Sequence, residues 1–312
     1  MGGIAAGGMA TRQAFGEAIV DIGSDPRVVV IDGDLKNSTF TEDFLAKYPE
    51  RFVECGIAES NMIGIAAGLA LAGKVPWACS FSAFITGRAE VIRVSVCYNR
   101  ANVRIVGTHV GIGIGDDGAT QMALQDIAMM RALPNMTVVQ PADRIETIQA
   151  VHALLDHDGP VFLRLMRQAT DDVHDDGYRF QLGKADVLRD GSDVALIATG
   201  SMVQESLKAA DALKADGIAA RVINVHTIKP LDVDGIVGAA GACGAVVTAE
   251  DHAVEGGLGG AVAEALAEAG SGAKLKRIGV DGFGESGGGP ELYEKYGLSA
   301  GHLVRAAKGL LG

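Results

Sequence analysis

Residues 51–73 read RFVECGIAESNMIGIAAGLALAG, in which a short run with Phe and Val leads through a polar turn into a long segment of small and apolar residues. The pattern predicts a strand at residues 51–55 and a helix at residues 58–71. The turn between them places a carboxyl side chain, Glu59, at the start of the predicted helix. A strand followed directly by a helix is the repeating unit of a parallel sheet that helices cover. This stretch therefore predicts an α/β fold.

Strand–helix alternation extends from this stretch toward both ends of the chain. Further strands are predicted at residues 27–32, 76–81, 103–108, 137–140 and 160–164, and further helices at 11–22, 84–98, 120–132 and 144–155. A polar, acidic stretch, DDVHDDGY at residues 171–178, then interrupts the alternation. Beyond it, strands are predicted at 193–199, 221–225, 245–248 and 276–280, helices near 232–240, 260–269 and 299–310, and Ser201 as the N-cap of another helix.

These elements predict the α/β class, with two three-layer α/β domains, the first built on a mostly parallel sheet. We expect a flexible leader at residues 1–10, a first domain at 11–170, a linker at 171–185 and a second domain at 186–312. The length of 312 residues suits two domains, and a hydrophobic fraction of 48% lets each of them bury a core.

Composition narrows the classes of partner. The net charge of −12 argues against nucleic acid, because phosphate backbones need clustered Lys and Arg, although a few local arginines can still hold one small anion. No stretch is long and apolar enough to suggest a membrane span. The cysteines form no CxxC pair, so neither a zinc site nor a disulfide framework is expected, and free cysteines favour a cytoplasmic location: Cys55, Cys79, Cys97 and Cys243.

Residues with useful chemistry follow several of the predicted strands. In an open α/β sheet, ligands bind beyond the carboxyl ends of the strands, so these residues would share one edge. They comprise carboxylates, aromatics, a histidine, arginines and a glycine-rich loop: Asp34, Ser38, Glu59, Phe81, Phe84, His109, residues 111–118 with Asp117, Arg164 and Arg167. An apolar body with a few convergent polar groups is typical of an enzyme pocket.

Each of these residues also has a simpler structural interpretation. Glu59 could complement the dipole of its helix, Phe81 and Phe84 could belong to the core, His109 could be an ordinary loop histidine and Arg167 could pair with an acid. The loop at 111–118 has neither a following Gly-Lys-Ser/Thr nor GxGxxG spacing, so it predicts no nucleotide-binding motif. The glycines at 256–260 also lack that spacing, and we expect them to serve packing.

Several segments together resemble the thiamine-diphosphate-dependent transketolase family. GIAESNMIGIAAGLALAG resembles the helix start that carries the family's catalytic glutamate, and SFSAFITGRA resembles its aromatic platform. THVGIGIGDDGAT is similar to its substrate loop, whereas HTIKPLD, AEDHAVEGGLGGAV and GVDGFGESGGGPELYEKYGL are similar to its C-terminal domain. The matches run in order through nearly the whole chain. They imply a thiamine pyrimidine-binding domain followed by a transketolase C-terminal domain.

The resemblance implies a divided enzyme. The family's usual first domain carries a GDG…N signature for Mg²⁺ and diphosphate, whereas Asp32-Gly33-Asp34 has the wrong order and context. The chain thus resembles the beta subunit of a split transketolase, a transferase of carbohydrate metabolism. The implied cofactor is thiamine diphosphate (thiamine pyrophosphate), with its pyrimidine end on this chain and Mg²⁺ or Ca²⁺ on a partner alpha subunit. An alpha2beta2 heterotetramer is the implied assembly.

The resemblance also assigns roles to individual residues, none of them as a metal ligand. Glu59 matches the glutamate that engages the pyrimidine ring nitrogen, and it is the implied catalytic residue. Cofactor contacts are implied for Glu59, Phe81, Phe84, Asp34 and Leu35. Contacts with a sugar-phosphate substrate are implied for Arg12, Ser38, His109, Asp117, Gln121 and Arg167.

Two positions depart from the family's pattern. Gln121 stands where the family usually has a His that approaches the reacting carbons, and Gln can hydrogen-bond but cannot act as an acid or base. Gly87 stands where longer members often have an aromatic residue, so we expect a neighbour or the partner subunit to fill that space. The implied reaction is transfer of a two-carbon ketol unit from a ketose phosphate to an aldose. Gln121 predicts a non-standard substrate, such as a branched or modified ketose.

Three alternatives stay open at this point. The beta subunit of a 2-oxoacid dehydrogenase shares the fold and the glutamate, but it would not need Arg12, Ser38 and Arg167 together. A deoxyxylulose phosphate synthase is related but is normally a single long chain. A non-catalytic regulatory or assembly subunit is disfavoured by the presence of Glu59 and Phe84, although Gln121 is compatible with it.

Overall fold

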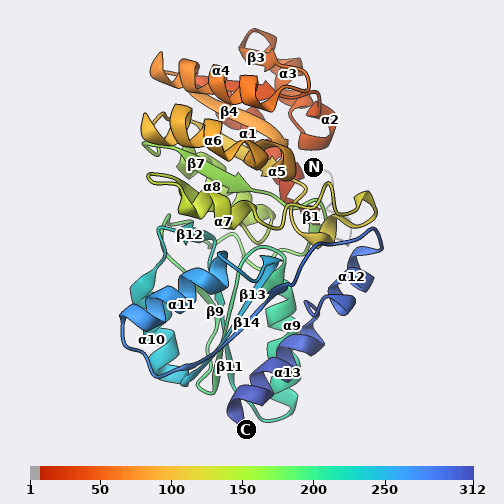
Figure 1. The fold of residues 1–312 in the computed structure, drawn as a ribbon, viewed down its shortest axis with the longest axis vertical. Helices are drawn as coiled ribbons and strands as arrows, with labels where there is room; N and C mark the ends of the chain where they lie inside the picture. The colour runs from red at the N-terminus through yellow and green to blue at the C-terminus, as the bar shows by residue number, and fades with distance from the viewer. Residues whose placement is uncertain (1–7) are drawn as a thin grey trace.

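Two stacked α/β domains make up the part of the chain that the computed structural model describes, residues 8–312 (Figure 1). Residues 1–7 of the predicted leader lie outside the described residues. The last two residues of the predicted leader form a strand, because β1 (Met9–Ala10) pairs antiparallel with β8 (Ala169–Thr170). Among the helices of residues 8–312, none has the length and apolarity needed to cross a bilayer.

The first domain contains a seven-stranded sheet in the order β12-β6-β7-β5-β4-β2-β3. Six of the strands are parallel to one another and coincide with predicted strands: β2 (Val28–Asp32), β3 (Phe52–Glu54), β4 (Val75–Phe81), β5 (Arg104–Thr108), β6 (Thr137–Val139) and β7 (Val161–Arg164). The prediction of a mostly parallel sheet is confirmed. Its carboxyl-end edge is therefore the place where the candidate residues should meet.

Helices cover both faces of this sheet. They are α1 (Thr11–Ile22), α2 (Lys36–Thr39), α3 (Glu42–Lys47), η1 (Pro49–Arg51), α4 (Glu59–Leu71), α5 (Ser82–Ile85), η2 (Thr86–Arg88), α6 (Ala89–Val91), η3 (Ile92–Tyr98), η4 (Ile112–Asp117), α7 (Asp126–Ala132) and α8 (Arg144–Leu155). Val28 and Val30 belong to one hydrophobic cluster with residues of α1 and α8, whereas Val29 and Ile31 belong to another with residues of α4 and α7. This alternation follows from the period of two along a strand, and it produces the three layers.

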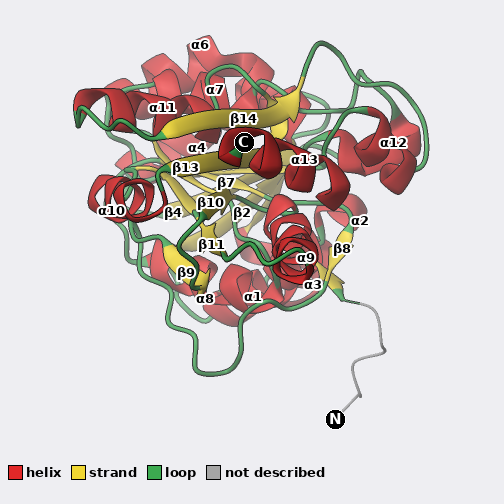
Figure 2. Cartoon of the chain, turned by 90° about the horizontal axis from the view of Figure 1, so that it is seen from below, coloured by secondary structure: helices red, strands yellow, loops and turns green. Residues whose placement is uncertain are grey.

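The second domain repeats the layered plan around a five-stranded sheet in the order β14-β13-β10-β11-β9. Its elements are β9 (Asp186–Arg189), β10 (Val194–Ala198), α9 (Met202–Ala215), β11 (Ala220–Asn224), α10 (Val233–Cys243), β13 (Ala245–Ala253), α11 (Leu258–Glu268), β14 (Lys274–Val280), α12 (Gly289–Lys295) and α13 (Ala300–Leu311). Figure 2 views this sheet between α10 and α11 on one side and α9 and α13 on the other. Only β9 is antiparallel to its neighbour.

The two domains share a strand and a core. β12 (Thr227–Lys229) follows β11 of the second domain but pairs antiparallel with β6 of the first sheet. Ile112 and Ile114, which follow β5 in the first domain, are buried in one hydrophobic cluster with β10 and β13 of the second. The segment after β5 is therefore anchored in both domains.

Three local expectations were wrong in detail. The predicted helix at 84–98 is divided into α5, η2, α6 and the π-helical η3. The predicted helix at 120–132 begins only at α7, because residues 119–121 form a turn, in which the Gln121 N–H donates to Gly118 O, and Ala123 makes a β-bridge with Val110. Ser201 does stand at the N-cap of α9, but its hydroxyl makes no capping bond and instead lies 2.7 Å from the Tyr293 hydroxyl.

Candidate active site

The predicted substrate residues meet in one open cavity at the carboxyl-end edge of the first sheet. The cavity has a volume of about 650 Å³. It is lined by all six of those residues and by three others: Arg12, Ser38, His109, Asp117, Gln121 and Arg167, with Asn37, Phe40 and Phe81. Two cations, one carboxylate and one imidazole therefore face a single space beside an aromatic surface, as a small anionic ligand requires.

Two arginines form the cationic side of the cavity. Arg12 is half-buried in α1, donates to Ser38 O at 2.7 Å, and lies with its guanidinium carbon 5.0 Å from the centre of the Phe40 ring. Burial and the nearby charge of Arg167 lower the pKa of Arg12, while the charge of Asp117 raises it. Among residues 8–312, the buried Nε of Arg12 has no hydrogen-bond partner. Two guanidiniums placed in this way favour an anion between them.

His109 is held as a neutral ring beside these arginines. Its ring stacks on Phe81 with centroids 3.7 Å apart, and its backbone has φ of 58°, in the left-handed region. Burial and the charges of Arg12 and Arg167 lower the pKa of His109 to about 3. Nε2 lies 3.4 Å from Arg12 Nη1, and Nδ1 lies 2.9 Å from Thr108 Oγ1. Because arginine only donates, Nε2 accepts and the ring proton belongs on Nδ1.

Phe81 and Phe84 form a flat aromatic surface. Phe81 ends β4 and Phe84 lies in α5, with ring centroids 5.5 Å apart and planes 16° from parallel. Both side chains are partly exposed, so the alternative that they are ordinary core residues does not hold. Nearby Gly87 is exposed, and a Cβ built on it would meet no atom within 4 Å. The described part of the chain thus leaves the space beside Gly87 open.

Glu59 opens α4 and is only 6% exposed. None of the hydrogen bonds or ion pairs within residues 8–312 involves its carboxylate. Buried carboxylates are normally paired or hydrogen-bonded, so this one is free to meet a ligand. Its place at a helix N-terminus also lets it complement the helix dipole, as the simpler interpretation proposes. The two interpretations are compatible.

Asp34 and Leu35 do not line the cavity. Both lie in the loop after β2, where Asp34 is exposed and Leu35 is half-buried. Buried Asp32 organises this loop by accepting from the Leu35 N–H at 2.7 Å and from the Thr39 hydroxyl at 2.7 Å. The same loop carries Ser38 into the cavity, so its ordering matters to the site even where its residues do not reach it.

Arg164 does not reach the cavity, contrary to the expectation from its place after β7. It is fully buried, with Nε 2.8 Å from Asp126 Oδ2, and Ser82 donates to the same carboxylate at 2.7 Å. Arg164 therefore supports the framework. Arg167, by contrast, is exposed and donates to the backbone oxygen of Ile114. It forms no ion pair with an acidic residue within residues 8–312, which was the simpler interpretation.

Exposed apolar residues and glycines lie along α4 and at the ends of its flanking segments. Ile57 and Tyr98 are each 83% exposed, and Leu71 is 68% exposed. Gly64 and Gly68 are exposed on α4, and a Cβ built on either would meet no atom within 4 Å. We call these five residues the α4–η3 face. Exposed apolar patches of this kind mark interaction sites.

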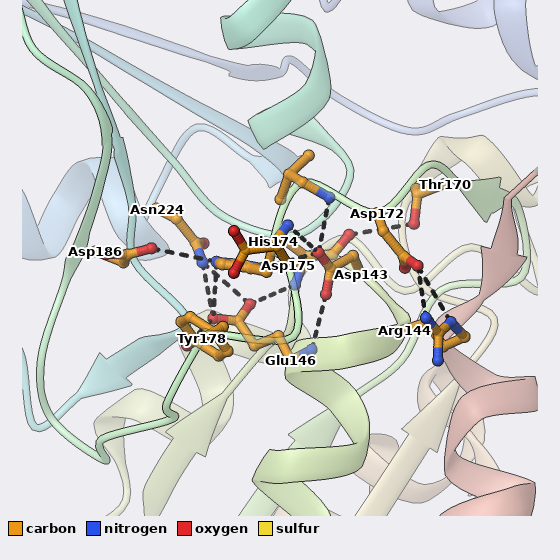
Figure 3. A network of polar contacts seen from close by, with 12 residues as sticks. Asp143, Arg144, Glu146, Thr170, Asp172, His174, Asp175, Tyr178, Asp186 and Asn224 are labelled. Atoms are coloured by element: carbon orange, nitrogen blue, oxygen red, sulfur yellow. Dashed lines mark hydrogen bonds and ion pairs between the residues drawn. The ribbon is translucent and has the colours of Figure 1, made fainter.

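A buried polar network joins the domains (Figure 3). His174, between the domains, lies with Nδ1 2.8 Å from Asp143 Oδ2 and Nε2 3.3 Å from Asp186 Oδ2. Burial by itself lowers the pKa of His174, but these two carboxylates and the charge of Glu146 together raise it to about 10. His174 is therefore a buried cation at neutral pH.

Glu146 of α8 completes this network, with Oε1 3.9 Å from His174 Nε2. It accepts from the Tyr178 hydroxyl at 2.6 Å, from Asn224 Nδ2 at 2.8 Å and from the Ala142 N–H at 2.7 Å. We call the whole set the junction network: Asp143, Glu146, His174, Tyr178, Asp186 and Asn224. It links α8, the segment between the domains, β9 and β11, and it holds the two domains in one arrangement.

Two lining residues escaped the sequence interpretation. Asn37 and Phe40 belong to the loop whose Ser38 was predicted. Phe40 ends α2 with φ of 60°, which turns the chain so that its ring meets Arg12. Only their closeness to Ser38 in the sequence could have suggested them.

Comparison with known proteins agrees with this arrangement. Residues 7–172 match the transketolase pyrimidine-binding domain family, and residues 183–303 match the transketolase C-terminal domain family. The two matches cover most of the chain, in the expected order.

Individual relatives extend along the whole chain. A transketolase C-terminal section of Methanocaldococcus jannaschii is 44% identical over 299 residues, which is 94% of each chain. A 6-deoxy-6-sulfo-D-fructose transketolase subunit of Clostridium sp. MSTE9 is 45% identical over 285 residues, 91% of this chain and 88% of that protein. A solved structure, "Split gene transketolase, inactive beta4 tetramer", superposes with a TM-score of 0.91 at 45% identity over 97% of this chain and 99% of that one. The chain spans about half the length of other, longer curated relatives.

Proposed function

The chain belongs to the transketolase family of transferases, and we propose that it is the beta subunit of a split enzyme that transfers a two-carbon ketol unit from an anionic ketose to an aldose. Relatives of matching length, named as a section or a subunit, support the split arrangement. The observation that carries the proposal is the single cavity in which Arg12, Arg167 and neutral His109 face the aromatic surface.

Thiamine diphosphate, when bound, supplies the carbanion chemistry that breaks and forms the carbon–carbon bond. Glu59 fits a partner for the pyrimidine ring nitrogen, because its buried carboxylate has no partner among residues 8–312 and could share a proton there. Phe81 and Phe84 offer a stacking surface for the pyrimidine. Asp34 and Leu35, in the loop after β2, are the proposed neighbours of the thiazolium end.

The cavity residues would bind and orient the sugar. Arg12 and Arg167 would hold the terminal anion, because each guanidinium offers several donors and Arg12 Nε lacks a partner in the described chain. Neutral His109 would present Nε2 as an acceptor to a sugar hydroxyl once Arg12 turns to the anion. Asp117 would accept a hydrogen bond from a sugar hydroxyl, which a charged carboxylate does strongly.

Gln121 and Ser38 would define which sugar fits. Gln121 lines the cavity and offers both a donor and an acceptor, but no acid or base. One relative is named for a ketose with a sulfonate in place of the phosphate. Two arginines can hold either tetrahedral anion, so we propose an anionic, non-standard ketose as substrate, with phosphate or sulfonate at its far end.

The partner alpha subunit would supply the diphosphate site with Mg²⁺ or Ca²⁺ and cover the α4–η3 face. Exposed Ile57 lies two residues before Glu59, so a protein on this face would also close the cofactor site. Gly64 and Gly68 have no side chains, so a partner helix could approach the backbone of α4 closely there. We propose an alpha2beta2 heterotetramer. The cysteines are free thiols, which supports the proposed cytoplasmic location.

Calorimetry of thiamine diphosphate binding with Mg²⁺ tests the divided site. We expect tight binding by the mixed subunits, no tight binding by this chain alone, and ketol transfer by the mixture from D-fructose 6-phosphate or 6-deoxy-6-sulfo-D-fructose. Tight binding by this chain alone would contradict the divided site. A mixture that binds the cofactor but acts only on 2-oxoacids would favour the dehydrogenase alternative.

A further inference from the structure

Residues 111–118, which we call the substrate loop, are held largely by the second domain. Ile112 and Ile114 are fully buried in the cluster that they share with β10 and β13. Ser286, in the glycine-rich stretch before α12, donates through its hydroxyl to Asp116 O at 2.7 Å. The loop carries Asp117 into the cavity. The position of a proposed sugar contact therefore depends on a domain that lines none of the cavity.

Asp251 of β13 binds the backbone at the start of the substrate loop. Its Oδ1 accepts from the Ile112 N–H at 2.8 Å, and its Oδ2 accepts from the Gly113 N–H at 3.1 Å. Gly111 has φ of 73°, and successive N–H groups after such a residue form a small anion-binding concavity. A Cβ on Gly111 would lie 2.2 Å from the Asp251 carboxyl carbon, so only glycine admits the carboxylate here.

Tyr293 of α12 links Asp251 to the cationic side of the cavity. Its hydroxyl donates to Asp251 Oδ2 at 2.8 Å and accepts from Gln168 Nε2 at 3.1 Å. Gln168 directly follows Arg167, whose guanidinium donates to Ile114 O in the same loop. One buried carboxylate thus connects the two segments that would hold opposite ends of the sugar.

The carboxyl end of β13 holds Asp251 in a fixed place. Pairing of β13 with β14 becomes irregular between Ala249 and Ala253, and such irregularities re-aim the side chains of a strand. Arg164 Nη2 then donates to Asp251 O at 3.1 Å, and Arg164 is itself fixed by Asp126. The carboxylate is therefore positioned from both domains before any ligand binds.

We propose that Asp251 is a positioning residue for sugar binding, which fixes the substrate loop through two backbone N–H groups and so places Asp117 against the sugar hydroxyls. The inference rests on the proposed function and adds to it a role for the second domain. That domain sets the affinity for the ketose without touching it.

The alternative is that Asp251 only helps to hold the two domains together. The domains are also joined by β12, by their shared core and by the junction network, and the Asp251 side chain belongs to none of these. Its neighbour Glu250 provides a matched control. Glu250 is equally buried on β13 and accepts two backbone N–H bonds, from Leu258 at 2.7 Å and Gly259 at 2.8 Å, but both lie within the second domain.

The test compares Asp251→Asn, Tyr293→Phe and Glu250→Gln in the assembled enzyme. With D-fructose 6-phosphate as the probe, we expect Asp251→Asn to raise KM about tenfold or more, since it weakens charge-assisted bonds, with kcat changed less than about threefold. Tyr293→Phe should raise KM less, and Glu250→Gln should leave it unchanged. Affinity for thiamine diphosphate should be unchanged in all three variants. Amide exchange of residues 112 and 113 should accelerate about tenfold or more in Asp251→Asn alone.

The outcomes separate this inference from the proposed function. An active wild-type enzyme in which Asp251→Asn keeps the wild-type KM and amide exchange would overturn the inference alone. An equal rise of KM in Glu250→Gln would also overturn it, because general damage to the second domain would then suffice. A wild-type mixture that transfers no ketol unit from phosphorylated or sulfonated ketoses would overturn the proposed function and the inference with it.

Discussion

The cavity and the junction network use similar residue types but differ in whether their charged groups pair with one another. In the junction network, Asp143 and Glu146 each accept several hydrogen bonds and His174 is enclosed as their counter-ion, although His174 Nε2 and Asn224 Oδ1 make no hydrogen bond. In the cavity, by contrast, Arg12 Nε has no hydrogen-bond partner within residues 8–312, and the ion pairs of these residues include neither Arg12 nor Arg167. The ion pairs do not include Glu59 either, which lies outside the cavity lining. Buried polar groups without partners are costly, so a protein retains them where a ligand or another chain completes the set.

The difference separates groups that stabilise the fold from groups that prepare a function. Changes in the junction network should alter stability and leave catalysis nearly intact. Changes at the cavity and the α4–η3 face should alter activity or assembly and leave stability nearly intact, because these groups contribute little to the isolated chain.

The largest effect should come from Glu59→Gln, which tests a carboxylate that forms no ion pair within residues 8–312. Loss of the proton-sharing carboxylate should lower ketol transfer by the assembled enzyme about 1,000-fold, within the range for general acid–base groups. The free energy of unfolding should change by less than about 1 kcal/mol, the scale of one charge at a helix N-terminus. Steady-state assays and urea unfolding measure the two quantities.

Glu90→Gln is the matched control for Glu59→Gln. Glu90 is an exposed glutamate of α6 in the same domain, and its replacement should change neither quantity. A Glu59→Gln enzyme with near-normal activity would sink the catalytic assignment and favour a non-catalytic subunit.

The next effect should come from His174→Asn, which tests the junction network. Removing a buried cation from between Asp143 and Asp186 should cost roughly 3 kcal/mol of unfolding free energy, as breaking buried ion pairs does. His152→Asn is the control, because His152 is exposed and its pair with Asp21, at 3.1 Å, should be worth about 0.5 kcal/mol or less. Equal losses in urea unfolding of the two variants would contradict the assignment of the junction network.

The pH dependence of stability should report the same histidine. The folded-state pKa of His174 is raised from 6.5 to about 10, so its stabilising contribution is fully present below pH 6.5 and is lost as pH rises toward 10. The difference in unfolding free energy between the wild type and His174→Asn should therefore shrink across this range. Subtracting the variant removes the titration of other groups. A difference that grows with pH would reverse the sign and rule out a buried cation.

A smaller effect should come from Gly64→Leu on the α4–η3 face. Because a side chain at Gly64 meets no atom of this chain and leucine is a better helix former, the isolated chain should be at least as stable as the wild type. Affinity for the alpha subunit should fall about 30-fold, as for a hot-spot residue worth about 2 kcal/mol. Gly238→Leu on α10 is the control, since Gly238 is equally open on the second domain. Unchanged assembly of Gly64→Leu would place the partner elsewhere.

The sequence predicted the framework well because the framework is locally encoded. The strand β2 is a continuous run, VVVID, with every residue buried, and such a run indicates a strand of a covered parallel sheet. The rule that ligands bind beyond strand ends then placed His109 and Arg167 along one edge, and both do line the cavity. Their assigned roles came from the family resemblance and stay predictions.

The sequence failed where partners from distant segments decide the outcome. DDVHDDGY indicated the start of a polar linker and gave no sign of a buried residue, yet His174 is buried because Asp143, Glu146 and Asp186 surround it. Arg164 looked like a site residue, yet Asp126 neutralises it in the interior. The strand β12 has only three residues and pairs across the domain boundary, so no local periodicity could reveal it. In each case the tertiary contact overrides the local composition.

The smallest effect should come from Gln121→His, which asks how the cavity selects its sugar. Gln121 already offers a donor and an acceptor, so histidine preserves hydrogen bonding and adds only a group that titrates near pH 6.5. We expect kcat/KM for D-fructose 6-phosphate to change by less than about tenfold, with a new pH dependence at about pH 6.5. We expect kcat/KM for 6-deoxy-6-sulfo-D-fructose to fall relative to that for D-fructose 6-phosphate. The measurement is the ratio of kcat/KM for the two ketoses from pH 6 to 8. A constant ratio would mean that Gln121 does not define the substrate, and the arginine pair would then carry the preference alone.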